Sequence, residues 1–200
     1  MRKEENVMFI CVYGAASSLI DKSYIEEGEE LGRRMAKRGH RLIFGGGSNG
    51  MMGAVARGMT EEKGVIVGVI PRFFQDAGAE ITYDKCTEYI FTDTMNERKQ
   101  FLEYTANAFI IAPGGIGTFD EFFQALTLKQ LGRHNKPMAI FDINGFYDEF
   151  AMALQKMVDQ KFITDDCAQL CKAFTDIDEM LDYIENYDQS EIDISKVKIR

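Results

Sequence analysis

Short apolar runs recur along the chain, and segments with helical periodicity separate them. Most of the runs are apolar throughout instead of alternating with polar residues, which is typical of strands buried on both faces of a sheet. They cover Val7–Tyr13, Leu42–Phe44, Val65–Ile70, Tyr89–Phe91, Ala108–Ala112 and Met138–Phe141. The helical segments cover about 23–39, 49–62, 95–107, 119–132, 146–160 and 176–187. This alternation predicts an α/β fold, a doubly wound parallel sheet with helices on both faces.

Length and composition predict one globular domain. The chain has 200 residues, 46% of them hydrophobic. Because single domains usually contain ~100–200 residues, we expect residues 1–200 to form one domain. No apolar run approaches the ~20 residues that span a bilayer, and Met1–Glu5 lacks the apolar core of a signal peptide. We therefore expect a cytoplasmic protein with no membrane association.

Charge and cysteine content argue against two further classes of protein. The net charge of -9 provides no basic surface for a nucleic-acid backbone, so we expect no nucleic-acid partner. With no secretion signal, the four cysteines are expected to be reduced thiols. Cys167 and Cys171 are spaced i, i+4 without a nearby histidine. Because structural zinc usually takes four ligands, we expect no metal site there.

Local signals mark where several helices begin. A Ser or Thr followed three residues later by Glu predicts a capping box, in which each side chain accepts a hydrogen bond from a backbone N–H at the helix start. The chain contains three such pairs: Ser23 with Glu26, Thr94 with Glu97, and Thr118 with Glu121. Asn144-Gly145 is predicted to form a turn. Residues 189–200 alternate weakly, and both an edge strand and a tail stay open for them.

Three turns that follow predicted strands are rich in small residues. They cover Gly14–Ser18, Gly45–Gly50 and Pro113–Thr118. Ligands of open α/β sheets bind beyond the carboxyl ends of the strands. Glycine lets backbone N–H groups approach an anion, and the helix that follows adds partial positive charge. A phosphate is therefore the expected ligand, although tight packing between strand and helix is the alternative for any single turn.

One of these turns also fits a dinucleotide-binding fingerprint. Gly45, Gly47 and Gly50 satisfy G-x-G-x-x-G. The fingerprint also requires an acidic residue ~20 positions later that binds the ribose. The next strand ends in Ile70-Pro71-Arg72 instead. A nicotinamide cofactor is therefore the weaker hypothesis.

Charged residues beside these turns are candidates for chemistry. Glu121 follows the third turn by one helical turn, which places a carboxylate next to whatever a bound phosphate is attached to. Completion of the capping box with Thr118 is the alternative interpretation. Arg98 and Lys99 occupy the first turn of another helix, where cations are unfavourable. A compensating anion is expected there, either a ligand phosphate or Glu121.

Three segments together resemble the motifs of the LOG family, the cytokinin riboside 5′-monophosphate phosphoribohydrolases, which are often mislabelled as lysine decarboxylases. They are Gly45–Gly53, Met95–Lys99 and Pro113–Glu121. The last segment matches the family's P-G-G-x-G-T-x-x-E signature at every fixed position. Two later segments, Asn135–Pro137 and Asn144–Tyr147, are also similar to family segments. The resemblance extends over about residues 7–165.

The resemblance implies a Rossmann-like homodimer that uses no metal or other cofactor. The implied reaction is hydrolysis of the N-glycosidic bond of a nucleoside 5′-monophosphate, AMP or N6-substituted AMP, to free base and ribose 5-phosphate. Arg98 and Glu121 correspond to the family's catalytic pair. The positions implied to bind substrate are Gly14, Ser17, Gly46, Gly47, Ser48, Asn49, Met95, Arg98, Lys99, Gly114, Gly115, Gly117, Thr118 and Glu121.

The chain departs from the family pattern at two places. Gly14-Ala15-Ala16-Ser17 stands where many members have Gly-Ser-Ser, which removes one hydroxyl. Asn96 replaces a histidine that is common in the second motif. What those side chains do in the family is therefore not carried over.

The residue types suit the implied chemistry. Cleavage of an N-glycoside builds oxocarbenium character on the ribose, which the Glu121 carboxylate can stabilise while it activates water. The planar guanidinium of Arg98 can hold the substrate and align Glu121.

Two other hypotheses remain beside the hydrolase. A nucleotide-binding or carrier module without turnover is the second, since a fold does not determine activity. A pyridoxal-phosphate decarboxylase is the third and is disfavoured, because that chemistry needs a lysine beside the phosphate turn and no suitable lysine segment lies there. Adenine and N6-substituted adenine both stay open as the base, since base selectivity depends on pocket shape.

Overall fold

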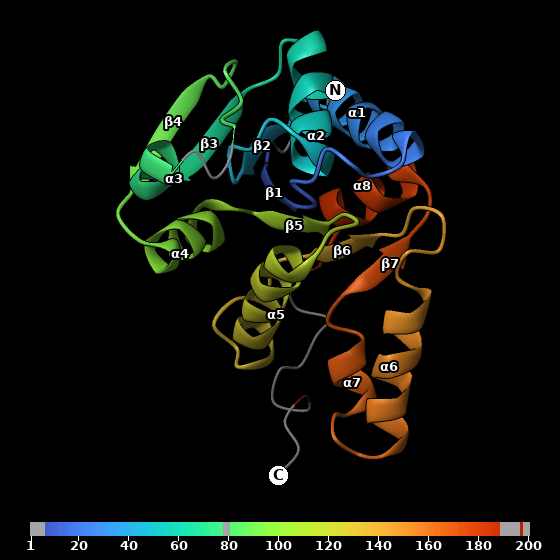
Figure 1. Ribbon diagram of the computed structural model, residues 1–200. Coiled ribbons are helices and arrows are strands. Elements are labelled where there is room, and N and C mark those ends of the chain that lie inside the picture. Colours follow the sequence, from blue (N-terminus) through green and yellow to red (C-terminus); the bar gives the residue numbers. More distant parts are fainter. Residues whose placement is uncertain (1–6, 78–80, 189–196, 198–200) are drawn as a thin grey trace.

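The computed structural model describes residues 7–77, 81–188 and 197, and it contains one seven-stranded sheet (Figure 1). Every pairing between neighbouring strands is parallel, and the strand order is β4-β3-β2-β1-β5-β6-β7. The order reverses direction between β1 and β5, which is where ligands of doubly wound sheets bind. The strands are β1 Phe9–Tyr13, β2 Arg41–Phe44, β3 Ile66–Pro71, β4 Glu88–Thr92, β5 Ala108–Ile111, β6 Met138–Phe141 and β7 Lys172–Phe174.

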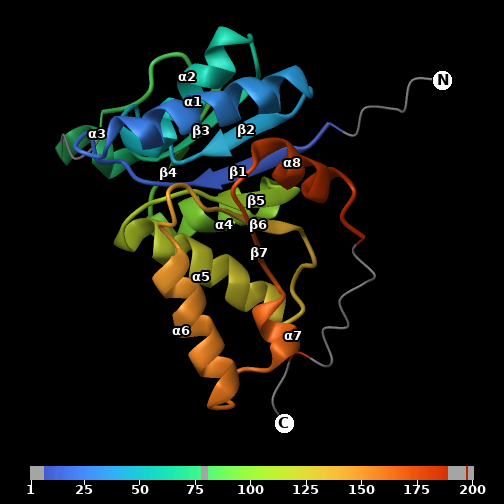
Figure 2. The same ribbon diagram turned by 90° about the vertical axis from the view of Figure 1, so that its right-hand side faces the viewer.

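Helices cover both faces of the sheet, as Figure 2 shows edge-on. One face carries α1 Lys22–Lys37, α2 Gly50–Glu61 and α8 Ile177–Glu185. The opposite face carries α4 Met95–Thr105, α5 Ile116–Gln130, α6 Asp148–Asp159 and α7 Asp165–Ala168. The short helix α3, Arg72–Ala77, follows β3 directly at the edge of the sheet toward which the strands run. The predicted fold class is confirmed.

The central strand β1 shows why its sequence is apolar throughout. Ile10 and Val12 pack in the core beneath α1 and α2, whereas Cys11 and Tyr13 pack in the core beneath α4 and α5. All four side chains are at most 2% exposed. Because a strand alternates its side chains between two faces, a strand covered on both sides needs apolar residues at every position.

Three elements were not expected from the sequence. These are β7 and the short helices α3 and α7, which contain three, six and four residues. Periodicity needs a longer window to separate helix from strand, so such short elements give little signal. The weakly alternating segment 189–200 lies, except for Val197, outside the residues that the structure describes.

The helix starts correct two of the three predicted capping boxes. Thr94 does cap α4, since its side chain accepts a hydrogen bond from the Glu97 N–H at 3.1 Å. The prediction for Ser23 was wrong because the N-cap of α1 is Asp21, two positions earlier, whose side chain accepts a hydrogen bond from the Ser23 N–H. The prediction for Thr118 was also wrong, because α5 begins at Ile116 and its N-cap is a glycine.

The turn predicted at Asn144-Gly145 is present, with φ of 55° and 69° at the two residues. This left-handed backbone is readily adopted by Gly and tolerated by Asn. No helix in the described part of the chain is long and apolar enough to cross a membrane.

Candidate active site

A cavity of about 380 Å³ lies at the carboxyl ends of the strands, around the point where the strand order reverses. Turns after β1 and β5 and the starts of α2, α3, α4 and α5 contribute to its wall. Its lining residues are Gly14, Ala15, Ala16, Ser17, Met52, Phe74, Met95, Arg98, Gly115, Gly117, Thr118, Asp120 and Glu121.

The start of α5 is open and carries no capping side chain. The N-cap of α5 is Gly115, so no side chain bonds the backbone N–H groups of the first turn. Those N–H groups have no partner within the helix, and the helix dipole adds partial positive charge there. A Cβ added at Gly115 or Gly117 would meet no atom within 4 Å. The first turn of α5 is therefore open toward the cavity, as a phosphate site requires.

Arg98 reaches the cavity from the first turn of α4 and is only 5% exposed. Its Nε donates to the Val69 carbonyl at 3.1 Å, and its Nη2 donates to the Gly45 carbonyl at 3.1 Å. The Gly45 carbonyl directly follows β2 and the Val69 carbonyl belongs to the neighbouring strand β3, so the guanidinium is fixed from two sides. The remaining nitrogen, Nη1, lies 3.8 Å from Glu121 Oε1. The structure therefore brings the two residues of the predicted pair together.

Glu121 lies in the second turn of α5, with its side chain toward the sheet and 8% of its surface exposed. Since Thr118 lies inside α5, the capping interpretation of this carboxylate is wrong. Instead Glu121 lies one turn from the open helix start and beside the Arg98 guanidinium. The Glu121 carboxylate therefore provides the compensating anion that was expected near Arg98.

A second ion pair links the same two helices. Lys99 Nζ lies 3.1 and 2.9 Å from the two carboxylate oxygens of Asp120. Asp120 lines the cavity, whereas Lys99 is not among the lining residues. The pair ties α4 to α5 and so helps to hold Arg98 against Glu121.

The first turn, Gly14–Ser17, joins the other two. The Ala15 N–H donates to the Pro113 carbonyl at 3.0 Å, and the Ala15 carbonyl accepts from the Met52 N–H at 3.2 Å. Ser17 Oγ accepts from the Leu19 N–H at 3.2 Å. The turn thus forms a wall of the cavity from backbone and small side chains.

The Gly45–Gly50 turn, unlike the other two turns, does not line the cavity. The Gly46 carbonyl accepts from the Tyr83 N–H, and the Ser48 N–H donates to the Ile81 carbonyl, both at 2.8 Å. This turn is therefore bonded to the segment after α3. The predicted substrate-binding residues that do not line the cavity are Gly46, Gly47, Ser48, Asn49, Lys99 and Gly114.

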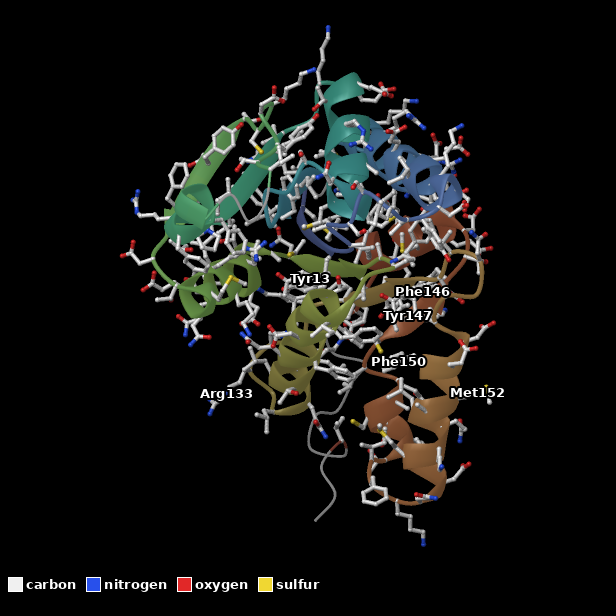
Figure 3. All side chains as sticks on the ribbon, viewed as in Figure 1. Tyr13, Arg133, Phe146, Tyr147, Phe150 and Met152 are labelled. Carbon is white, nitrogen blue, oxygen red and sulfur yellow. The ribbon has the colours of Figure 1, made fainter. Side chains whose placement is uncertain are left out.

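Tyr147 supports the third turn from behind. Its hydroxyl donates to the Ala112 carbonyl at 2.8 Å, directly before Pro113. Burial raises the pKa of Tyr147 well above its ordinary value, so the hydroxyl stays a protonated donor at neutral pH. Figure 3 shows Tyr147 and Phe150 between the ribbons of α5 and α6.

Several residues of the site were not found from the sequence. Gly45 and Val69 act through backbone carbonyls, which carry no side-chain signal. A Cβ at Gly45 would collide with the Arg98 guanidinium, so a glycine there makes room for the arginine. Met52 and Phe74 also line the cavity. Met52 belongs to the Gly45–Gly53 motif but was not among the expected substrate-binding residues, and Phe74 belongs to α3, which was not expected. Asp120 also lines the cavity and was not among the residues expected in the site.

The described residues contain no group of three or more His, Cys, Asp and Glu side chains placed to hold a metal ion. All four cysteines are free thiols. Cys11 lies beneath the site, and burial raises the pKa of its thiol well above the ordinary value. A buried neutral thiol is a poor nucleophile, so Cys11 is not a candidate for nucleophilic chemistry.

Fold and site define a doubly wound α/β protein with an open helix start beside a buried arginine–glutamate pair. A family model described as possible lysine decarboxylase matches residues 52–184. The Arabidopsis thaliana cytokinin riboside 5′-monophosphate phosphoribohydrolase LOG2 is 33% identical over 178 residues, which cover 89% of this chain and 83% of the relative. The LOG enzyme of Oryza sativa subsp. japonica is 34% identical over 89% of this chain and 73% of its own. The chain belongs to this LOG-like family.

A solved structure with a similar fold is the molybdenum cofactor carrier protein MCP of Chlamydomonas reinhardtii. The TM-score is 0.67 at 22% identity, and the match covers 90% of this chain and 97% of the other. The structure named TM1055 gives the same TM-score at 23% identity, over 90% and 99% of the two chains. At these identities the likeness concerns the fold alone.

Proposed function

We propose that this protein hydrolyses the N-glycosidic bond of a nucleoside 5′-monophosphate, AMP or its N6-substituted form, to release the base and ribose 5-phosphate. The observation that carries the proposal is the open start of α5, one helical turn from the Glu121 carboxylate. A phosphate held by the first turn of α5 brings the attached ribose beside that carboxylate. The printed names of the relatives support the same reaction.

Each residue of the pair has a distinct task in this reaction. As the bond from C1′ to the base breaks, positive charge builds on the ribose, and Glu121 stabilises it electrostatically. The same carboxylate orients and deprotonates the attacking water. Arg98, held by the Val69 and Gly45 carbonyls, fixes the Glu121 side chain and contributes its remaining donors to the substrate. Water thus supplies the hydroxyl group that bonds to C1′ and the proton that the departing base takes up, so atoms and charge balance.

Release of adenine from AMP, followed by chromatography, tests the proposal directly. The parent protein is expected to cleave AMP and to leave adenosine intact, because the phosphate provides the binding energy that positions the glycosidic bond. Adenosine cleaved as efficiently as AMP contradicts the proposal. Ribose 5-phosphate and inorganic phosphate are expected to compete with AMP.

Substitution of Glu121 separates binding from chemistry. Glu121→Gln keeps the side-chain shape and is expected to bind AMP, while turnover falls by about 100-fold or more. Near-parent turnover of this variant removes Glu121 from the mechanism.

Arg98→Lys is also expected to lose most of its turnover, because lysine lacks the two-pronged set of donors. Lys99→Ala, which changes only the ion pair with Asp120, is expected to lose less turnover.

A carrier without turnover is the second candidate, because carrier proteins are known on this fold. The close approach of Arg98 to Glu121 favours the hydrolase, since binding alone does not require a carboxylate beside the anion site. Tight binding of AMP without release of adenine would favour the carrier.

We further propose that the protein functions as a homodimer through the exposed side of α6 and the residues that follow it. No residue of α6 is buried, and Met152 and Phe162 are 71% and 73% exposed. Figure 3 shows Met152 on the side of α6 turned away from α5. Large exposed apolar side chains gathered on one face mark interaction surfaces. The opposite face is closed by ion pairs, such as Arg38 with Asp182 at 2.6 Å.

Sedimentation of two matched variants tests the dimer. Met152→Glu places a charge in the apolar face and is expected to shift the protein toward monomer. Gln160→Glu adds the same charge at an exposed polar position after α6 and is expected to stay dimeric. Equal sedimentation of the two variants contradicts this interface, and a monomeric parent contradicts the dimer.

A further inference from the structure

The cavity wall divides by chemistry along the sheet. The turns after β1 and β5 supply small and polar residues, among them Ser17, Gly115 and Thr118. The large apolar side chains come from elements that follow β2, β3 and β4, which lie in that order on one side of β1. These side chains are Met52 of α2, Phe74 of α3 and Met95 of α4.

Arg98 connects the two halves of the cavity. Its Nη1 lies 3.8 Å from Glu121 Oε1, and its Cζ lies over the Phe74 ring at 5.7 Å from the centroid. The Phe74 ring is therefore one guanidinium group away from the carboxylate. A ligand that begins at α5 and passes Glu121 toward β2–β4 reaches Phe74.

Phe74 is not used by the packed core. The clusters of packed apolar side chains in the described part of the chain do not include it. Its contacts are instead the Arg98 guanidinium and the ring of Phe73, an edge contact at 5.0 Å. Phe73 is 41% exposed and does not line the cavity. Two adjacent phenylalanines thus differ in one respect, since only Phe74 faces the site.

We propose that Phe74 is the stacking surface for the nucleobase of the substrate. This inference rests on the proposed function, which places the phosphate at the start of α5 and C1′ beside Glu121. The base on C1′ then extends toward β2–β4, where the wall is apolar and contains one aromatic ring. Purines stack on aromatic side chains through their π faces, and a nearby guanidinium strengthens such contacts. Met52 and Met95 complete an apolar end that adapts to the shape of the base.

Ribose 5-phosphate provides the decisive control, because it carries the phosphate and the sugar but no base. Phe74→Leu keeps an apolar side chain and removes the ring. The variant is expected to raise KM for AMP by about tenfold, a typical loss when a stacked aromatic is removed. The inhibition constant of ribose 5-phosphate is expected to stay within about twofold of the parent, since that ligand does not reach the ring.

Two further variants isolate the aromatic contact. Phe74→Tyr retains the ring and is expected to keep the parent KM for AMP. Phe73→Leu makes the same change one residue earlier, outside the cavity, and is expected to behave like the parent. An unchanged KM for AMP in Phe74→Leu overturns the inference. Equal weakening of AMP and ribose 5-phosphate also overturns it, because it indicates a general distortion of the site.

Calorimetric binding keeps this test separate from the test of turnover. In a Glu121→Gln background, Phe74→Leu is expected to weaken AMP and spare ribose 5-phosphate. A parent protein that binds AMP without cleaving it contradicts the proposed hydrolysis, and the binding comparison still decides the role of Phe74. A parent that does not bind AMP overturns both proposals.

Discussion

The glycine-rich turns Gly45–Gly50 and Pro113–Thr118 look alike in sequence, but only the first is closely packed by other parts of the chain. Each follows a buried strand and precedes a helix. Around the Gly45–Gly50 turn the chain itself occupies the space, since a Cβ at Gly45 would meet Arg98 and one at Gly50 would meet backbone of the first turn. At Gly115 and Gly117 an added Cβ would meet nothing within 4 Å.

Glycine therefore serves opposite purposes in the two places. In the Gly45–Gly50 turn the missing side chains let other segments of the protein pack closely, including the arginine of the site. At the start of α5 the missing side chains leave backbone N–H groups facing open space. A glycine-rich turn indicates a phosphate site only where that space is not already taken by the protein.

The largest effect is expected when the open turn receives a negative charge. Gly115→Asp places a carboxylate where the phosphate is proposed to bind, and we expect AMP cleavage to fall by about 100-fold or more because the substrate loses its anchor. Stability is expected to be preserved, since Asp is a favourable N-cap residue and its Cβ has room. The measurements are adenine release and thermal unfolding.

Gly115→Asn is the matched control for that variant. Asparagine has the same shape and similar capping ability without the charge, so a much smaller loss of activity is expected. Equal losses in the two variants indicate that bulk, not charge, matters at this position. Unchanged cleavage by Gly115→Asp contradicts a phosphate site at the start of α5.

An intermediate effect on activity is expected when a methyl group is added in the closely packed Gly45–Gly50 turn. Gly45→Ala pushes against the Arg98 guanidinium, and we expect turnover of AMP to fall by about tenfold or more because Arg98 shifts from Glu121. Overpacking is expected to destabilise the protein by about 1–3 kcal/mol. Inhibition by ribose 5-phosphate is expected to change little, because the phosphate turn lies on another element.

Gly64→Ala controls for destabilisation alone. A Cβ there would collide with Met59 and Ala36, away from the site. We expect a loss of stability with parent turnover at a temperature where the variant is folded. If Gly45→Ala behaves in the same way, the Gly45–Gly50 turn contributes only to folding.

The sequence predicted most of the sheet because β1, β3, β5 and β6 are apolar throughout or nearly so, and burial on both faces leaves that pattern directly in the residues. The family motifs also pointed to Arg98 and Glu121, which the structure places 3.8 Å apart. It did not predict that Thr118 lies inside α5. A capping box is read from two residues only, whereas the observed helix start depends on the turn after β5.

Contacts between distant segments account for what the sequence did not predict. The role of Gly45 depends on Arg98, which lies 53 positions later in the chain. Phe74 lies in a six-residue helix that leaves no periodic signal, and its place in the cavity follows from the order of the strands. Which glycine turn is open also depends on segment 81–83, which bonds to the Gly45–Gly50 turn.

The smallest effect on stability is expected at Gly117. There the change in the free energy of unfolding has the opposite sign to that expected for the Gly45–Gly50 turn. Gly117 lies in the first turn of α5, where glycine costs about 0.5–1 kcal/mol relative to alanine because it loses more backbone entropy. Since an added Cβ meets nothing, Gly117→Ala is expected to raise the free energy of unfolding by this amount, the reverse of Gly45→Ala. The methyl group enters the cavity, so KM for AMP is expected to rise. Chemical denaturation and initial rates measure the two changes, and a destabilised Gly117→Ala protein contradicts an open turn.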